Sequence, residues 1–311
     1  MPAHDHLKAE AGANGEFKRQ GNAFTTPFGD APGELPVEAG RYRLIVGKLC
    51  PWAHRQLIVR ELLGLTDAIS VGVVDPIRGE NGWEFTLDPG GVDPVLGIHE
   101  LREAYLAADP GYDRRPTVPA VVDLTTGAVV QNDYHRLTHY WETAWAPLHA
   151  PGAPDLYPAG LRDQIDEISA FVFERVNNGV YRCGFARTQE AYEDAYDVLF
   201  EALDTLEDRL GRSRFLVGNQ VHDGDLGAVL LESNTAHLVA HMHRARKIVV
   251  ANLFGHLAGK GKHGRLRRRI GECGVDRLIR PVGLANARHK RVAVGGLFLR
   301  VGDRDRHLVT V

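Results

Sequence analysis

Residues 47–55 read GKLCPWAHR. An apolar run at 42–46 comes before them, and an apolar-periodic run at 56–65 comes after them. This order is typical of a strand, a tight loop and a helix. Cys50 then stands at the entrance of the helix, with Pro51 at the first helical position, where the missing N–H is not needed.

The position of Cys50 predicts a reactive thiol. The first N–H groups of a helix have no partner inside it and carry the positive end of its dipole. A thiol there is expected to have a stabilised thiolate, the nucleophilic form. Ala53 stands where a Cys-x-x-Cys pair has its second thiol, so Cys50 needs an external thiol to complete a turnover. The alternative is a buried cysteine that packs as a small hydrophobe. We interpret Cys183 and Cys273 as free structural thiols, and His54 as a structural or solvated histidine rather than a modulator of the Cys50 pKa.

The composition describes a chain of 311 residues with three cysteines, long enough for two domains. An odd and sparse set of cysteines argues against a disulfide framework and favours a reducing compartment. Residues 1–20 contain no apolar stretch of the signal-peptide type, and no apolar run approaches the length of a membrane span. We therefore expect a cytoplasmic protein without a membrane partner, and we assign no metal ligands.

A thioredoxin-like domain is predicted over residues 41–146, after an extended leader over residues 1–40. The strand, loop and helix of 41–65 and the β-rich run 69–74 form a βαβ unit with parallel strands. Three further elements follow: a helix over 98–108, a hairpin with strands at 120–122 and 128–130, and a helix that runs to 145. The leader contains three phenylalanines that would attach it to a surface, namely Phe17, Phe24 and Phe28. The alternative for the first dozen residues is a disordered tail.

The dipeptide Val118-Pro119 stands at the mouth of the third predicted strand and is a candidate cis peptide bond. In the thioredoxin-like order this proline faces Cys50. A cis proline exposes the backbone of the residue before it, so Val118 can offer its N–H and C=O to an extended peptide, as an added strand does. Asp133, at a predicted helix start, is a candidate for binding an α-amino group.

An all-helical domain is predicted over residues 147–227. A linker over 135–158 with four prolines leads into a helix over 159–178, and a second helix follows over 188–210. Both helices carry apolar residues at helical spacing on one face, which we interpret first as core.

These segments together resemble the glutathionyl-hydroquinone reductases, the Xi class of the glutathione transferases. The matching residues run in family order from about residue 17 to about residue 225. The most specific segments are CPWAHR at 50–55 and NNGVY at 177–181. The others are FTTPF at 24–28, VDP at 74–76, Gly82-Trp83, TVP at 117–119, Asn132-Asp133 and DLYP at 155–158.

The resemblance implies an α/β thioredoxin-like domain that binds glutathione, followed by a helical glutathione-transferase domain over the acceptor site. Cys50 matches the catalytic cysteine, and Tyr181 matches an acceptor-site tyrosine. The positions that contact glutathione are matched by Trp83, Arg115 and Val118. Asp133-Tyr134 stands where many members have Glu-Ser, so the carboxylate is kept but is shorter. A related low-molecular-weight thiol is therefore an alternative to glutathione as the co-substrate.

The activity that the resemblance implies is removal of glutathione from glutathionyl-hydroquinones. The Cys50 thiolate attacks the sulfur of the conjugate, the hydroquinone leaves, and a Cys50–glutathione mixed disulfide remains. A second glutathione then releases glutathione disulfide. Tyr181 is a candidate hydrogen-bond partner of the quinol oxygen. The expected partners are thus a small-molecule thiol and quinone or hydroquinone conjugates, and a homodimer stays open.

The resemblance stops near Asp225, where the charge of the chain changes sign. Residues 228–311 carry 17 Lys and Arg against 5 Asp and Glu, while the rest carries 20 against 35. A basic run at 260–270 and a strand-like run at 292–301 stand where the family has aromatic-rich helices. Three hypotheses fit this tail: a diverged domain, a basic nucleic-acid-binding appendage, or an out-of-frame translation of a GC-rich gene, which we favour.

Two functions remain at this point. The first is a glutathione-dependent thiol reductase, and Cys50-dependent thiol turnover would support it. The second is a catalytically impaired transferase-like protein with an incomplete helical domain and a nucleic-acid-binding or out-of-frame tail. Salt-sensitive retention on DNA that is lost on truncation after Asp225 would support the second function. Nucleic acid is the less favoured partner.

Overall fold

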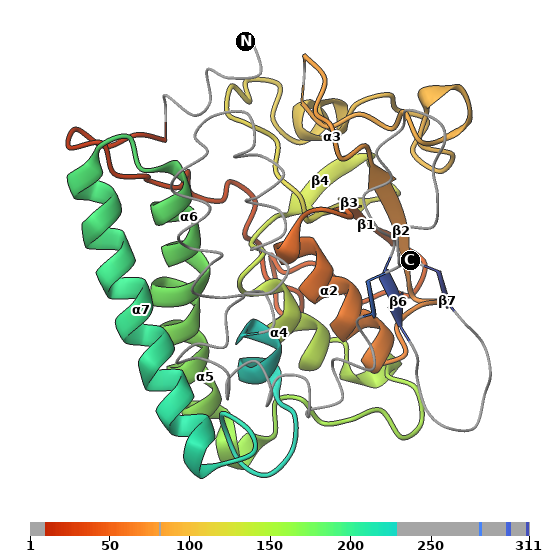
Figure 1. Cartoon of the computed structure of the whole chain (residues 1–311). Helices are drawn as coiled ribbons and strands as arrows, with labels where there is room; N and C mark the ends of the chain where they lie inside the picture. The colour runs from red at the N-terminus through yellow and green to blue at the C-terminus, as the bar shows by residue number, and fades with distance from the viewer. Residues whose placement is uncertain (1–9, 81, 229–279, 282–296, 300–308, 311) are drawn as a thin grey trace, which may run out of the picture.

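The computed structural model describes residues 10–80, 82–228, 280–281, 297–299 and 309–310. Up to residue 228, a small mixed sheet carries helices on it, and a separate group of helices stands beside it (Figure 1). The predicted fold class, a thioredoxin-like domain followed by a helical domain, is confirmed.

The sheet is built around β1 (Tyr42–Gly47), whose six residues are all buried. This strand pairs in parallel with β2 (Ile69–Val74) and antiparallel with β3 (Ala120–Asp123). The fourth strand, β4 (Ala128–Gln131), completes the order β2-β1-β3-β4. A strand with a neighbour on each side and cover on both faces is mostly apolar, which is why the sequence predicts it well. The exception is Arg43, whose guanidinium pairs with the buried Asp93 carboxylate at 2.8 Å.

Three helices accompany the sheet. Helix α2 (Pro51–Leu62) has Cys50 at its N-cap, and it lies with α4 (Leu137–Glu142) on one face of the sheet (Figure 1). The helix predicted from residue 98 begins later, as α3 (Leu101–Ala108), because Glu100 and Glu103 form a capping box that starts the helix there. The helix predicted to run to 145 ends at Glu142. Two short 3-10 turns complete this part of the chain, η1 (Pro89–Gly91) and η2 (Ala146–Leu148).

The helical part is longer than the predicted helix over 159–178. It opens with four segments in chain order, namely η3 (Ala159–Leu161), α5 (Arg162–Phe171), the π-helical segment η4 (Val172–Asn177) and α6 (Asn178–Phe185). Helix α7 (Gln189–Arg212) then packs along α6 (Figure 1). The Thr188 hydroxyl caps α7 by accepting the Ala191 N–H at 3.2 Å. The π-helical segment has no signal in the apolar periodicity.

Two apolar clusters form the interior. One cluster lies around the sheet and includes Phe17 and Phe28 from the leader. The other is formed mainly by α5, η4, α6 and α7. We propose on this ground the predicted division into domains over residues 41–146 and 147–227.

The described part of the leader lies on the protein. All three phenylalanines make ring contacts, such as Phe24 with Tyr105 at 5.6 Å and Phe28 with Tyr42 at 5.2 Å between centroids. The leader runs past the end of α6 to the sheet (Figure 1). Residues 1–9 lie outside the described residues.

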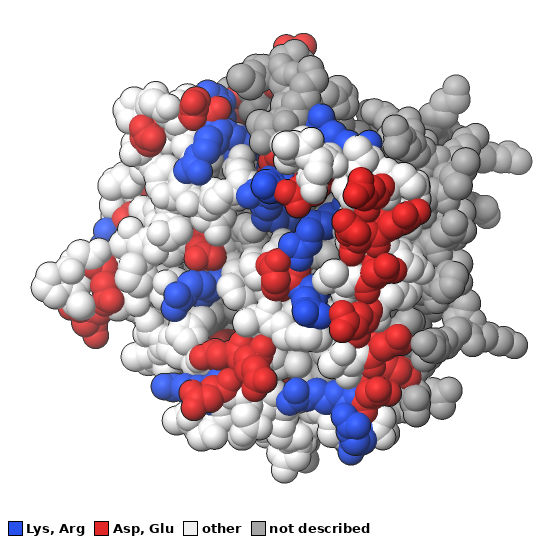
Figure 2. Space-filling model, turned by 90° about the vertical axis from the view of Figure 1, so that its left-hand side faces the viewer, with Lys and Arg blue, Asp and Glu red and all other residues white. Residues whose placement is uncertain are grey.

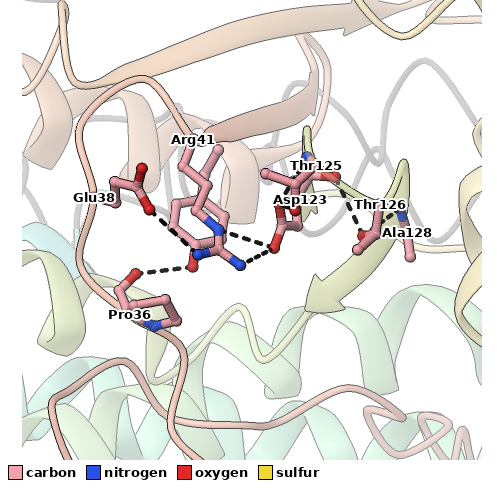
Figure 3. Close-up of polar contacts among 8 residues, drawn as sticks. Pro36, Glu38, Arg41, Asp123, Thr125, Thr126 and Ala128 are labelled. Atoms are coloured by element: carbon pink, nitrogen blue, oxygen red, sulfur yellow. Dashed lines mark hydrogen bonds and ion pairs between the residues drawn. The ribbon is translucent and has the colours of Figure 1, made fainter.

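The end of the leader is fastened to the β3–β4 turn, as Figure 3 shows. The Arg41 guanidinium contacts the Asp123 carboxylate at 2.8 Å and the Glu38 carboxylate at 3.3 Å. The Tyr42 hydroxyl donates to the Pro36 carbonyl at 2.8 Å. These contacts join the leader to β1 before the chain reaches Cys50.

The two domains meet at a buried ionic cluster. Arg55 on α2 forms an ion pair with Asp223, and their side chains are only 3% and 9% exposed. The carboxyl group of Glu142 on α4 lies beside Asp223. Burial, with the neighbouring Asp223 charge, raises the pKa of Glu142 well above its ordinary value of 4.5. Glu142 therefore keeps its proton to a higher pH than an exposed glutamate does.

Glu142→Gln is expected to change how stability depends on pH. The raised pKa means that folded Glu142 binds a proton more tightly than unfolded Glu142. The wild type therefore loses stability as pH rises from about 4.5 through the folded pKa, by up to about 1.4 kcal/mol per pH unit. The introduced glutamine does not titrate, so the stability of the variant relative to the wild type should rise as the pH rises over this range. Urea unfolding between about pH 5 and 7.5 checks this, and a constant difference across these pH values would contradict it.

The face that carries α7 has exposed acidic residues in clusters with basic residues between them (Figure 2). Within the described ranges, no helix is long and apolar enough to cross a membrane, and no group of three or more His, Cys, Asp or Glu could hold a metal ion.

Three short strands are described in the tail, namely β5 (Arg280–Pro281), β6 (Leu297–Leu299) and β7 (Val309–Thr310), paired antiparallel in the order β5-β6-β7. Strand β6 lies inside the strand-like run at 292–301. The basic run at 260–270 and Cys273 lie outside the described residues. The three hypotheses for the tail depend on these residues and stay predictions.

Candidate active site

Cys50 and the Val118-Pro119 peptide meet where the two central strands, β1 and β3, end and begin. The Val118-Pro119 peptide is cis, as predicted. The Cys50 Sγ donates to the Val118 carbonyl at 3.3 Å. Pro51 begins α2 in the expected manner, and Cys50 makes no side-chain cap bond to it. Local sequence thus places Cys50 at a helix start and Val118 before a proline, and the pairing of β1 with β3 brings the two residues together.

The environment of the thiol differs from the prediction. Burial raises the pKa of Cys50, and it outweighs the N–H groups of Ala53 and Trp52 and the charges of Arg19 and Arg78, which lower it. The side chain is 8% exposed, so its thiolate loses most of its hydration. The stabilising N–H groups at the helix N-terminus are present, but burial has the larger effect on the pKa of Cys50.

Neither His54 nor Cys183 takes part in thiolate formation. Burial lowers the pKa of His54 to about 4, so its imidazole is neutral near pH 7 and adds no positive charge. Cys183 is a free thiol on α6, 2% exposed, and burial raises its pKa to about 12. Both agree with the predicted structural roles.

The ring of Trp83 lies beside a cation. The Arg78 guanidinium stands 4.4 Å from the centroid of its ring. The indole N–H of Trp83 is buried and has no hydrogen-bond partner in the described part of the chain. A buried indole N–H normally has a partner, so this donor is suited to an acceptor on a ligand.

Arg115 is held by the leader. Its guanidinium pairs with the Glu10 carboxylate at 2.9 Å, and its carbonyl accepts from the Gln20 side chain at 2.8 Å. Its Nε–H is buried and has no partner among the described residues. One end of the Arg115 guanidinium is thus already paired, with the Glu10 carboxylate of the leader.

Asp133 lies in the turn before α4 and also contacts the leader. Its carboxylate accepts the N–H groups of His135 and Arg136 at 3.3 Å each, and both residues precede the first residue of α4. The Asn22 side chain donates to the same carboxylate oxygen at 3.3 Å. A ligand amine at this point would therefore share the carboxylate with these three donors.

A buried hydroxyl network joins the cis-proline loop to Asn132. The Tyr105 hydroxyl donates to the Thr117 carbonyl at 2.9 Å, and the Asn132 amide donates to the Tyr105 oxygen at 3.2 Å. The Asn132 N–H in turn donates to the Phe24 carbonyl at 2.8 Å. This network fixes the loop that carries Val118.

Tyr181 forms the opposite wall of the site, on α6. It is 7% exposed, and its ring lies 6.2 Å from that of Trp52. Burial, followed by the Cys50 charge, raises the pKa of Tyr181, so its phenol stays protonated. The Arg19 guanidinium lies 4.2 Å from the centroid of the Tyr181 ring.

The comparisons with known proteins agree with this geometry. The chain is 40% identical over 232 residues to the glutathionyl-hydroquinone reductase YqjG of Escherichia coli, which covers 72% of this chain and 70% of that protein. The chain belongs to the glutathionyl-hydroquinone reductase family. No protein-family model matches this family member.

Solved structures of the family support the same placement. The Xi glutathione-S-transferase of Phanerochaete chrysosporium is 36% identical with a TM-score of 0.72, over 86% of this chain and 83% of that one. The glutathione-bound structure of YqjG from Escherichia coli is 34% identical with a TM-score of 0.63, over 80% and 87% of the two chains. The reductase family is thus a family of glutathione-dependent enzymes, and this chain is one of its members.

The sequence prediction for this reductase family member missed the leader's contribution. Arg19, Glu10 and Asn22 all contact residues predicted for the site, and none was assigned a role. Arg78 was missed as well, although it stands only five residues before Trp83. A lone arginine in a Gly-rich polar segment has no local pattern that marks it as part of a site.

Proposed function

We propose that this protein is a glutathione-dependent reductase that removes glutathione from glutathionyl-hydroquinones through a Cys50–glutathione mixed disulfide. The observation that carries the proposal is the Cys50 thiol at the N-terminus of α2, bonded to the carbonyl of a cis-proline loop at 3.3 Å. The identity of the two substrates, glutathione and a hydroquinone conjugate, is inferred from a relative that is named for that reaction.

The reaction proceeds in two thiol-exchange steps. The Cys50 thiolate attacks the glutathione sulfur of the conjugate, so an S–S bond forms and the bond from sulfur to the ring carbon breaks. The electron pair of the broken bond stays on the ring carbon, which takes a proton and leaves as the hydroquinone. A second glutathione thiolate attacks the mixed disulfide, releases glutathione disulfide and restores Cys50. The sum is one conjugate reduced and two glutathione sulfurs oxidised to a disulfide.

The thiol-binding side uses donors that have no other partner among the described residues. The unpartnered indole N–H of Trp83 and the Nε–H of Arg115 suit the carboxylates of glutathione. The backbone of Val118 suits its extended peptide, and Asp133 suits its α-amino group. Glutathione carries two carboxylates, one amine and a peptide backbone, so it can use all four residues. A related thiol that lacks the glycine carboxylate would use fewer of these donors.

Tyr181 serves the aromatic acceptor. Its phenol stays protonated because burial raises its pKa. A neutral phenol donates a hydrogen bond to the quinol oxygen. The Trp52 and Phe17 rings, at 6.2 and 6.3 Å from Tyr181, provide aromatic faces for a hydroquinone ring.

Intact mass after incubation with a glutathionyl-hydroquinone tests the first half-reaction. We expect the wild type to gain one glutathione and to release free hydroquinone. Addition of glutathione should then remove the adduct and yield glutathione disulfide. No adduct on a protein that unfolds cooperatively would overturn the proposal.

A further inference from the structure

Arg19 lies on the acceptor side of the site, inside a cage of four aromatic rings. Its guanidinium carbon is 4.2 Å from the centroid of Tyr181, 5.4 Å from that of Trp52 and 5.7 Å from that of Tyr134. The Phe17 ring of its own segment is 5.5 Å away. Each ring offers a negative face to the cation, so the cage holds the charge in place without neutralising it.

One end of the guanidinium is held and the other is not. The Nε–H donates to the Asn178 side chain on α6 at 3.1 Å. The Nη2 atom is buried and has no hydrogen-bond partner in the described part of the protein. A buried guanidinium donor without a partner costs free energy, so a donor kept in this state is suited to an anion that forms during turnover.

The segment that carries Arg19 is fixed to both domains. Glu10 pairs with Arg115 at 2.9 Å, and Asn22 donates to Asp133 at 3.3 Å, both in the thioredoxin-like domain. The Thr188 hydroxyl at the start of α7 donates to the Asn14 carbonyl at 2.9 Å. Arg19 therefore reaches the site from a segment that is fastened before and after it, which keeps its position.

The thiolate of Cys50 has few sources of positive charge among the described residues. Around it stand Arg19 from the leader, Arg78 from the loop after β2, Tyr134 before α4 and Tyr181 on α6. Arg78 is engaged with the Trp83 ring and faces the like charge of Arg115, and burial lowers its pKa to about 10. Both tyrosines are kept neutral by burial, which raises the pKa of each. Arg19 is thus the cation on the acceptor side of the thiol.

We propose that Arg19 is a positioning residue of the reaction, which stabilises the Cys50 thiolate from the leader and so makes residues 10–28 part of the active site. The inference rests on the proposed function, because it takes Cys50 as the nucleophile. Its charge offsets part of the desolvation of the thiolate, an effect that a residue with a merely structural role would not have.

The test is the pH profile of Cys50 alkylation by iodoacetamide in the full chain, followed by mass mapping of the modified cysteine. Arg19→Met keeps the bulk of the side chain and removes the charge, and Arg19→Lys keeps the charge. We expect the midpoint of the profile in Arg19→Met to move up by about one pH unit, with an alkylation rate about tenfold lower at pH 7. Arg19→Lys should recover part of this loss.

The matched control is Arg175→Met. Arg175 also faces a ring, Phe171 at 5.8 Å, and pairs with Glu201 at 3.2 Å, but its side chain is 43% exposed. Its profile should equal that of the wild type. Two outcomes would overturn the proposal, provided that all variants keep the wild-type melting temperature. One is a wild-type pH profile in Arg19→Met, and the other is an equal shift of the midpoint in Arg19→Lys and Arg19→Met. A wild type that is alkylated at Cys50 but forms no glutathione adduct would instead sink the proposed function, so the two failures are distinct.

Discussion

Cys50→Ala should abolish turnover of glutathionyl-hydroquinones, with a loss of at least about a thousandfold. The thiolate is the nucleophile that forms the mixed disulfide, and Ala53 leaves no second thiol in the motif to replace it. The folded state should change little, because the side chain is small and makes one weak hydrogen bond, to the Val118 carbonyl at 3.3 Å. The measurement is release of hydroquinone in the presence of glutathione, with intact mass to detect the adduct.

Cys183→Ala is the matched control for this prediction. Cys183 is also a free and buried thiol, but it lies on α6 in the helical core, and its raised pKa of about 12 keeps it protonated. We expect it to keep its activity and to lose no more than about 1 kcal/mol of stability. Substantial turnover in purified Cys50→Ala, or inactivity of both variants, would remove Cys50 from the proposed role.

Arg55→Met should destabilise the protein by about 3–5 kcal/mol, because it leaves a buried carboxylate without its cation. Arg55 and Asp223 join α2 to the segment after α7, and both side chains are nearly inaccessible. The guanidinium also lowers the pKa of Asp223, which lies beside Glu142. Urea unfolding at pH 7 should show a lower midpoint with an unchanged slope if the transition stays two-state.

Two variants separate buried charge from lost packing. Arg55→Met combined with Asp223→Asn removes both charges and should lose clearly less stability than Arg55→Met alone. Arg175→Ala breaks an ion pair of similar kind, at 3.2 Å, whose side chains are 43% and 71% exposed, and should cost less than about 1 kcal/mol. A double variant that is as unstable as Arg55→Met would show that packing, not charge, sets the loss.

Residues close in sequence made the fold predictable. Three features express a local preference that the structure fulfils: the largely apolar β1, Pro51 after Cys50, and the hairpin turn between β3 and β4. The differences lie where local preference is weak or is overridden. Helix α3 starts at its capping box rather than at the first apolar residue. The predicted helix at 159–178 contains a π-helical segment, and α6 continues it to Phe185.

The sequence by itself determined the thioredoxin-like order, the cis proline opposite Cys50 and the position of the thiol at a helix start. Only the tertiary structure decided the pKa of that thiol, because burial acts through every atom that excludes water, and it opposes the helix N-terminus. Only the tertiary structure brought Arg19 and Glu10 to the site, since both contact residues more than a hundred positions away. Charge and burial are sums over neighbours in space, and the sequence does not list those neighbours.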